Sequence, residues 1–258
     1  MSFNRYELTQ AKLKLPSGTE LHRIKSTQDI VLWDGSVVSQ GTLGGWVQSM
    51  SNLDQRGNSW IFGDGKAYGQ ARVSGSAILR DSAEVFDRAL VYGQAILELR
   101  GRVYGSARVL DTAKVRCDAQ VRDFCRIYGS AIITGNALVG GYARIAGNSI
   151  ISGYSVVEEW ARLYGYVSIL GDAWVGGSSR LFDRVVLLER ARVDGRAKIS
   201  GCVQMKGNSH ATDDAVIYGP ILLDNDDKVT DCSLVTNCVN DKSTSDQCPP
   251  APVIVGCI

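Results

Sequence analysis

The chain contains 258 residues, of which 45% are hydrophobic and 21% are charged. Its 28 lysine and arginine residues are balanced by 27 aspartate and glutamate residues. The resulting net charge of +1 excludes a uniformly basic nucleic-acid binder and an acidic nucleic-acid mimic, so any electrostatic function must come from how the charges are arranged. Twenty-eight glycines against five prolines predict many tight turns rather than a proline-rich linker.

The first 18 residues have no apolar run behind a basic tip, so we expect no targeting signal there. No stretch approaches the roughly 18 apolar residues of a membrane helix, so we expect a soluble, cytoplasmic protein with no membrane partner. Within residues 1–58, residues 21–24 and 30–33 have strand character, and the second run ends at the turn signal Asp34-Gly35. We expect residues 1–58 to form a small β cap over the repeat that follows, because an uncovered solenoid edge recruits other chains.

The central part of the chain repeats every six residues without an insertion. From Ala71 to Ala215, 25 positions hold sixteen Ala, four Ser, three Val, Cys125 and Gly101. Two residues later, 23 of the 25 positions are Val, Ile or Leu, and two residues later again 15 are Gly and six are Asp. The first two positions face the same side of a short strand, and the third tolerates the positive φ of a sharp corner. Each hexad is therefore predicted to be a short strand followed by a corner.

The outward-facing residues repeat every 18 residues, which indicates three hexads per coil and three faces of different chemistry. The first face carries Arg72, Leu90, Arg108, Arg126, Arg144, Arg162, Arg180, Lys198 and Val216. The second carries Ile78, Ile96, Lys114, Ile132, Ile150, Ser168, Val186 and Gln204. The third carries Glu84, Arg102, Gln120, Leu138, Val156, Trp174, Arg192 and His210. We predict an all-β, parallel β-helix solenoid over residues 59–221 with eight to nine triangular coils, followed by an irregular tail at 222–258.

These hexads resemble the left-handed β-helix built from hexapeptide repeats. Residues 73–77 (VSGSA) have its spacing, with Gly one place later than in the acyltransferase motif. This late Gly, together with GTLGGWV at 41–47 and SWIFG at 59–63, is similar to the YdcK family of single-stranded left-handed β-helix proteins of bacteria and phages. The resemblance covers roughly residues 40–220 and implies a left-handed solenoid. It implies little about activity, because the family's acyltransferase label rests mainly on shared architecture.

The sequence contains few catalytic candidates. His22 precedes the repeat, whereas His210 occupies an outward strand position close to Asp213 and Asp214, which would orient it as the base of an acyl-CoA-dependent acyltransferase. We favour a non-catalytic, exposed histidine, because no loop interrupts the hexads to exclude water. No nucleophile motif, carboxylate pair or phosphate-binding loop occurs in the sequence. We expect no cofactor, and we keep acyl transfer as the alternative.

The cysteines suggest no metal site. Cys125 occupies a small-residue position of the repeat and is predicted to fill the core. Four more lie near the C-terminus at intervals of 6, 10 and 9 residues: Cys232, Cys238, Cys248 and Cys257. These intervals lack the close paired spacing of a zinc module, so we interpret the four as ordinary thiols. The tail that contains them is polar apart from residues 252–255, and we expect it to fold back or to bind a partner.

The first face carries an arginine ladder beside a row of aromatic residues. We predict that a macromolecular partner, a protein or a nucleic acid of anionic character, binds Arg108, Arg126, Arg144, Arg162, Arg180, Tyr128 and Tyr164. Like charges stacked about 4.8 Å apart repel by roughly 1 kcal/mol per exposed pair in water. Salt, a polyanion whose rings stack on the tyrosines, or the protein's own acidic tail could neutralise the row. The acidic residues of that tail are Asp224, Asp226, Asp227 and Asp231.

The second face carries an apolar stripe that is larger than a soluble monomer exposes. Its members are Ile78, Ile96, Ile132, Ile150 and Val186. Either self-association into a dimer or trimer, or a docked N- or C-terminal segment, would cover this stripe. We therefore predict a non-enzymatic interaction or scaffold protein that forms a homo-oligomer. A purely structural homo-oligomer is a further alternative.

Overall fold

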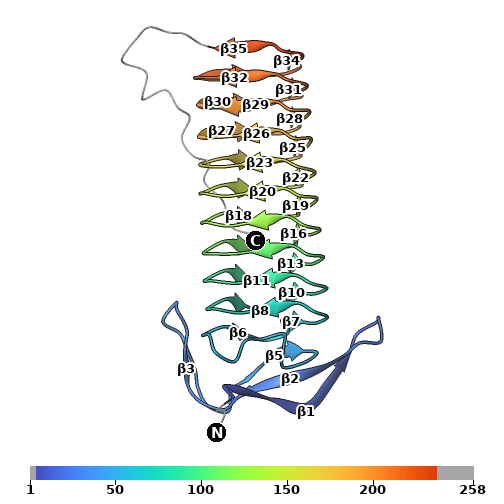
Figure 1. The fold of residues 1–258 in the computed structure, drawn as a ribbon, viewed down its shortest axis with the longest axis vertical. Coiled ribbons are helices and arrows are strands. Elements are labelled where there is room, and N and C mark those ends of the chain that lie inside the picture. The colour runs from blue at the N-terminus through green and yellow to red at the C-terminus, as the bar shows by residue number, and fades with distance from the viewer. Residues whose placement is uncertain (1–3, 237–258) are drawn as a thin grey trace. The chain divides into compact units, whose positions relative to one another are not determined.

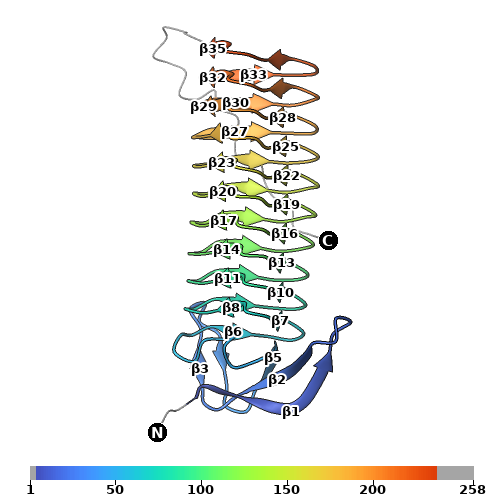
Figure 2. The same ribbon diagram turned by 45° about the vertical axis from the view of Figure 1, so that its right-hand side comes forward.

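The computed structural model describes residues 4–236, which form short β-strands joined by tight turns (Figures 1 and 2). The chain divides into two compact units, Met1–Tyr128 and Gly129–Ile258. Counted over both units, the solenoid has about 11 turns of about 18 residues, and its strands belong to three parallel sheets. No helix within the described residues has the length and apolar character needed to cross a membrane.

In the first unit, sheet A contains β1 (Tyr6–Lys14), β2 (Glu20–Ser26), β5 (Leu43–Val47), β7 (Lys66–Ala67), β10 (Glu84–Val85), β13 (Arg102–Val103) and β16 (Gln120–Val121). Sheet C contains β8 (Arg72–Val73), β11 (Leu90–Val91), β14 (Arg108–Val109) and β17 (Arg126–Ile127). Sheet D contains β6 (Trp60–Ile61), β9 (Ile78–Leu79), β12 (Ile96–Leu97) and β15 (Lys114–Val115). The hairpin of β3 (Ile30–Val31) and β4 (Val37–Val38) forms sheet B.

In the second unit, sheet A contains β19 (Leu138–Val139), β22 (Val156–Val157), β25 (Trp174–Val175), β28 (Arg192–Val193), β31 (His210–Ala211) and β34 (Lys228–Val229). Sheet C contains β20 (Arg144–Ile145), β23 (Arg162–Leu163), β26 (Arg180–Leu181), β29 (Lys198–Ser200), β32 (Val216–Tyr218) and β35 (Leu234–Thr236). Sheet D contains β18 (Ile132–Ile133), β21 (Ile150–Ile151), β24 (Ser168–Ile169), β27 (Arg184–Leu187), β30 (Cys202–Met205) and β33 (Ile221–Leu223).

The interior of each unit is built from the two inward positions of the hexad. Every small-residue position from 71 to 215 and every aliphatic position from 73 to 217 is buried. Where Ser replaces Ala, its hydroxyl can donate to the carbonyl three residues earlier, as Ser149 does to Ala146 (2.7 Å) and Ser179 to Gly176 (2.7 Å). Ser149 and Ser179 therefore enter the core with a satisfied hydroxyl, whereas the buried hydroxyl of Ser209 has no hydrogen-bond partner in the part of the chain that the structure describes. The predicted all-β solenoid with 18-residue coils is confirmed.

The corners have the backbone conformation that the hexad predicts. All 25 corner residues between positions 75 and 219 have a positive φ, including the ten that are not glycine. Acidic corner residues also accept a backbone hydrogen bond from the next coil. The carboxylate of Asp81 accepts a hydrogen bond from the amide of Leu99 (2.9 Å). The carboxylate of Asp87 accepts one from the amide of Gly105 (3.0 Å). Aspartate therefore suits these corners because it tolerates the conformation and pairs a neighbouring amide.

The N-terminal cap is an antiparallel extension of sheet A. Strand β1 pairs antiparallel with β2, β2 pairs antiparallel with β5, and β5 pairs parallel with β7. The predicted strands at 21–24 and 30–33 correspond to β2 and β3. Strand β1 has no counterpart in the prediction, because most of its side chains are at least partly exposed and its sequence lacks a regular apolar alternation.

The number of turns is larger than the eight to nine predicted. Strands β33, β34 and β35 pair parallel with β30, β31 and β32, although the regular hexads end near Pro220. At the other end, β5 and an isolated bridge between Leu53 and Val73 precede the regular repeat. Leu223 and Val229 keep the buried aliphatic position, and Asn225 and Asp231 keep the corner with positive φ, so the solenoid extends to about 11 turns although the small-residue position is lost.

Candidate anion-binding face

Sheet C presents a ladder of cationic side chains in each unit. In the first unit, paired neighbours are Arg72 with Leu90, Leu90 with Arg108, and Arg108 with Arg126. In the second unit, they are Arg144 with Arg162, Arg162 with Arg180, and Arg180 with Lys198. Equivalent residues of neighbouring parallel strands face the same side about 4.8 Å apart. The 18-residue spacing therefore aligns these side chains in each unit as predicted.

Among the residues that the structure describes, the ladder arginines have no acidic partner. Arg108, Arg126, Arg144 and Arg180 are exposed, and Arg162 is half-buried. Within residues 4–236, none of these five forms an ion pair or a side-chain hydrogen bond. Like charges are therefore stacked without compensation from residues 4–236, and this arrangement favours the binding of an anion.

Other cationic residues of the chain are paired at the same 18-residue spacing. Arg100 contacts Asp118 at 2.7 Å, and on sheet A Glu84 lies between Lys66 (2.9 Å) and Arg102 (3.6 Å). Opposite charges on neighbouring coils are thus readily accommodated elsewhere in the solenoid. The absence of such pairs from the ladder is a property of sheet C and not of the architecture.

Two of the acidic residues predicted to neutralise the ladder, Asp224 and Asp226, have other partners. Asp224 pairs with Lys206 at 2.9 Å, and Asp226 accepts a hydrogen bond from Asn208 at 3.1 Å. These carboxylates follow β33, at the corner between sheets D and A. The predicted compensation of the ladder by the acidic tail is therefore not supported by these residues. The apolar residues 252–255 lie outside the described residues.

The cysteines differ in their state. Cys125 is buried in the core as predicted, and burial raises the pKa of its thiol to about 12. Cys232 is an exposed, free thiol. Cys117 and Cys202 each take part in a disulfide bond, which was not predicted and which a reducing cytosol rarely preserves. The remaining three cysteines lie outside the described residues: Cys238, Cys248 and Cys257.

Aromatic side chains flank the ladder on both sides. Tyr128 and Tyr164 are half-buried, and Tyr164 stacks on Phe182 with 5.8 Å between ring centroids. At the turn before the sheet C strands, Tyr142 and Trp160 stack at 4.2 Å with an interplanar angle of 5°. This second pair was not predicted, because the hexad leaves its position free to vary. Only the 18-residue spacing of the two rings could have indicated it.

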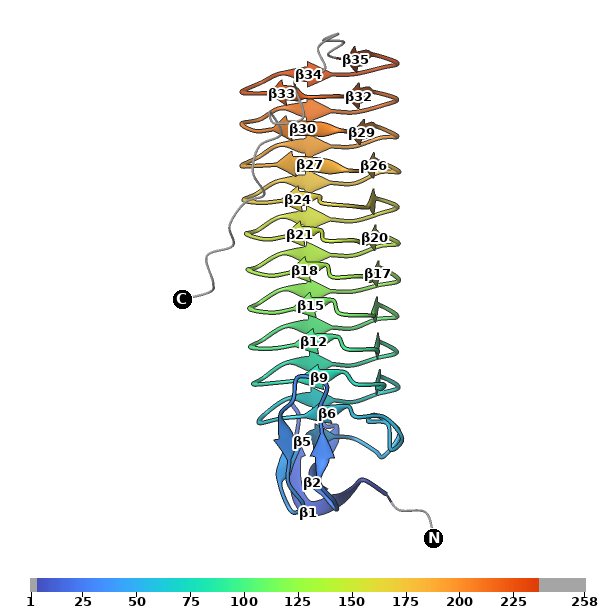
Figure 3. The ribbon, with the colours of Figure 1, turned by 90° about the vertical axis from the view of Figure 1, so that its left-hand side faces the viewer.

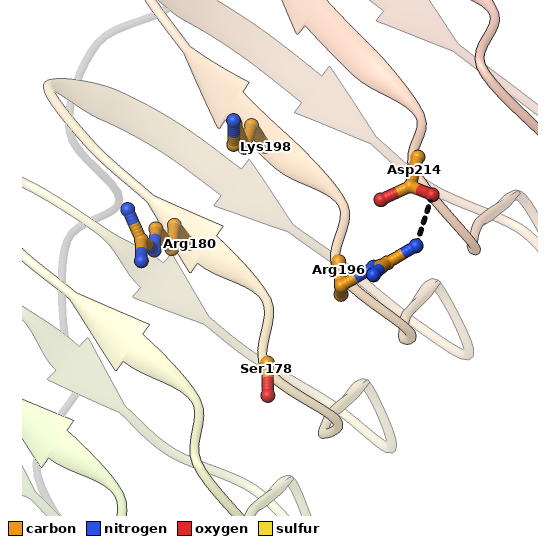
Figure 4. A pocket seen from close by; sticks show the side chains of 5 residues that line it. All are labelled: Ser178, Arg180, Arg196, Lys198 and Asp214. Atoms are coloured by element: carbon orange, nitrogen blue, oxygen red, sulfur yellow. Dashed lines mark hydrogen bonds and ion pairs between the residues drawn. The ribbon is translucent and has the colours of Figure 1, made fainter.

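A pocket of about 350 Å³ lies at the same turn in the second unit. Its lining residues are Ser178, Arg180, Arg196, Lys198 and Asp214 (Figure 4). Arg196 is hydrogen-bonded and ion-paired to Asp214, which raises the pKa of its guanidinium. Three cations and one carboxylate make the pocket electropositive, which suits a phosphate, sulfate or carboxylate group.

No protein-family model and no curated protein matches this chain. The architecture alone does not define a function, because one fold supports many activities. The geometry of the sites therefore has to carry the functional argument.

The surroundings of His210 do not match those predicted for a general base. His210 lies half-buried on β31, between cationic residues of β28 and β34. The two carboxylates predicted to orient it have other partners: Asp214 pairs with Arg196, and Asp213 accepts the amide of Asp231 at 3.4 Å. Among the described residues, no group of three His, Cys, Asp or Glu side chains could hold a metal ion. This geometry does not favour acyl transfer.

The apolar stripe on sheet D is covered at its start by the N-terminal segment. Ile78 faces outward yet is fully buried, and Ile96 is only 9% exposed. Asp34, in the turn of the β3–β4 hairpin, pairs with Arg80 directly after β9, so the hairpin lies against this part of the sheet (Figure 3). A docked N-terminal segment is one of the two coverings predicted. The second unit has its own, half-buried stripe residues on sheet D: Ile132, Ile150 and Val186.

Proposed function

We propose that this protein is a non-enzymatic interaction or scaffold protein that binds an extended anionic macromolecule along sheet C. The observation that carries the proposal is the arginine ladder, in which like charges stack on neighbouring strands without an acidic partner in the described part of the chain. Each such contact costs roughly 1 kcal/mol in water, and a bound polyanion removes that cost and releases its own counterions.

The rigidity of the ladder supports an extended ligand. The amide of Arg144 donates to the carbonyl of Ala161 (2.9 Å), and that of Arg162 donates to Ser179 (3.0 Å), so backbone hydrogen bonds fix the spacing of the strands. A surface that is ordered before binding loses little conformational entropy when the ligand arrives. Regularly spaced cations on such a surface suit a polymer with regularly spaced anionic groups.

We further propose that the chain is a relative of the YdcK family and forms a left-handed solenoid. This is supported by the corner glycines with positive φ, which stand at the position where that family has its late Gly, and by the 18-residue coils. An experimental structure tests the proposed hand.

The function is tested by charge reversal on the ladder. In the triple variant Arg144→Glu, Arg162→Glu and Arg180→Glu, binding of a fluorescein-labelled single strand of about 20 nucleotides and of labelled heparin is measured by anisotropy. The wild type should bind at least one probe, with an affinity that falls linearly with salt on logarithmic axes. The variant should lose about a hundredfold in affinity at low salt.

A matched control separates the ladder from net charge. Arg100→Glu, Arg190→Glu and Arg192→Glu make the same change in net charge at exposed positions away from sheet C. This control should stay within about threefold of the wild type. Equal losses in both triple variants, or no binding of either probe by the wild type, would contradict the proposal.

A further inference from the structure

A column of side chains borders the ladder of the second unit. Its members are Tyr142, Trp160, Ser178, Arg196 and Asp214, each two residues before a sheet C strand or its equivalent position. They lie on successive coils, because the amide of Trp160 donates to Gly177 (2.9 Å) and that of Ser178 donates to Gly195 (2.6 Å). Along the column, two stacked rings are followed by a serine and then by a planar guanidinium.

Ser178 leaves a gap in this column. One face of the Trp160 indole is covered by Tyr142, yet 54% of Trp160 remains exposed. The coils of Trp160 and Arg196 are two strand spacings apart, about 9.6 Å, which leaves room for one flat ring between them. The serine side chain is too short to fill this space. The pocket of about 350 Å³ begins at Ser178 and continues past Arg196 to Asp214.

The charges beside the gap belong to the ladder. Arg180 and Lys198 are paired neighbours on β26 and β29, and both line the pocket (Figure 4). Neither forms an ion pair within residues 4–236. Arg196, by contrast, is tied to Asp214 of the following coil, so its guanidinium is held in place on the far side of the Ser178 gap from Trp160 (Figure 4). The gap above Trp160 therefore adjoins a pocket with two cations that are available to an anion.

We propose that the Ser178 gap binds one nucleotide of a single-stranded nucleic acid. The base stacks between the Trp160 indole and the Arg196 guanidinium, and a phosphate contacts Arg180 and Lys198. The hydroxyl of Ser178 is within the pocket and can donate to or accept from the edge of the base. A flat base fits this slot better than an acidic sugar, whose ring is puckered. This inference rests on the proposed function and names the polyanion.

The gap is tested with a strand that lacks bases. Wild-type protein should bind an oligonucleotide of about 10 nucleotides some tenfold to a hundredfold more tightly than an abasic strand of equal length and charge. Ser178→Trp fills the gap with the residue that the column already accepts at position 160. This variant should lose the preference for the intact strand and retain its affinity for the abasic one.

Asn136→Trp is the matched control, because Asn136 is exposed and holds the equivalent position at another corner of the same unit. It should keep the preference for bases. A second readout is tryptophan fluorescence, which the intact strand should quench in the wild type and not in Trp160→Phe.

The outcomes separate this inference from the function on which it rests. Equal affinity of the wild type for intact and abasic strands, or binding of heparin alone, overturns the nucleotide site and leaves the polyanion surface standing. Loss of the base preference in Asn136→Trp also overturns it. Failure to bind any of the probes overturns both proposals.

Discussion

Single residues at the corners carry the strain of this fold. Leu99 adopts φ 59°, a region that costs a side chain with a Cβ about 1–2 kcal/mol per residue. It is 41% exposed, so its packing offsets little of that cost. The strain is tolerated because the amide of Leu99 donates to Asp81 of the preceding coil (2.9 Å). Corners occupied by residues other than Gly, Asp or Asn are therefore places where stability can be gained.

Leu99→Gly should raise the free energy of unfolding by about 1 kcal/mol, because glycine adopts a positive φ without steric cost. Urea unfolding followed by circular dichroism measures the change. Gly105→Ala serves as the reverse case, since a Cβ there would lie 2.8 Å from the amide nitrogen of Asp123. The Gly105→Ala variant should be less stable than the wild type. A loss of stability in Leu99→Gly would contradict the prediction, because it would mean that packing of the leucine side chain outweighs the backbone strain.

The buried thiol of Cys125 predicts a loss of stability in alkali. Its pKa is raised by burial from 9.0 to about 12, so below pH 9 both folded and unfolded chains keep the proton. Between pH 9 and 12 only the unfolded chain releases it, which favours unfolding by up to ~1.4 kcal/mol per pH unit. Cys125→Ala, which places the commonest residue of the repeat at this position, should unfold with a shallower pH dependence. If the free energy of unfolding of the wild type and of Cys125→Ala, measured by urea titration, depends on pH in the same way, the loss of stability does not come from this thiol.

At the scale of elements, the three sheets share one interior and differ in their exteriors. Sheet A places Glu84 between two cations, whereas sheet C of the second unit stacks four cations in a row, from Arg144 to Lys198. The hexad pattern determines which residue types are buried, but it does not determine the outward-facing residues of each sheet. The arrangement of charges on a face is thus free to serve binding, at a small cost in stability.

Arg162→Glu should make the protein more stable and a weaker binder. The change converts the contacts with Arg144 and Arg180 from repulsive to attractive, which should stabilise the fold by about 1 kcal/mol at low salt. Thermal unfolding at low and high salt measures the effect, and the difference from wild type should shrink as salt screens the charges. An unchanged or lowered melting temperature at low salt would mean that the ladder carries no repulsion.

The strands, the core and the aligned faces could be predicted because each depends on a residue type that recurs at a fixed spacing. The aromatic pair of Tyr142 and Trp160 and the gap at Ser178 could not, since they occupy a hexad position with no preferred residue. The outer turns escaped prediction for a related reason. Their small-residue position is occupied by Ile221 and Asp227, which hides the hexad, although Leu223 and Val229 remain in the buried aliphatic position.

At the scale of the whole molecule, the apolar residues of the second unit bear on assembly. Ile132 and Ile150 are neighbours on β18 and β21 and are half-buried. If a second copy of the chain covers them, Ile132→Glu with Ile150→Glu should convert the oligomer to monomers, as measured by light scattering after gel filtration. Circular dichroism should remain that of a folded β protein. A wild type that is already monomeric would reject self-association through this stripe.

The period of the coil restricts how such a chain can change in length. Removing 18 residues from the second unit would take away one rung and return every later side chain to its original face. Removing six residues would preserve the alternation of strands and corners. It would, however, move every later residue onto the adjacent sheet and break the ladder. Insertions and deletions that preserve the binding surface therefore come in multiples of 18 residues. The hydrophobic interior alone would tolerate multiples of six.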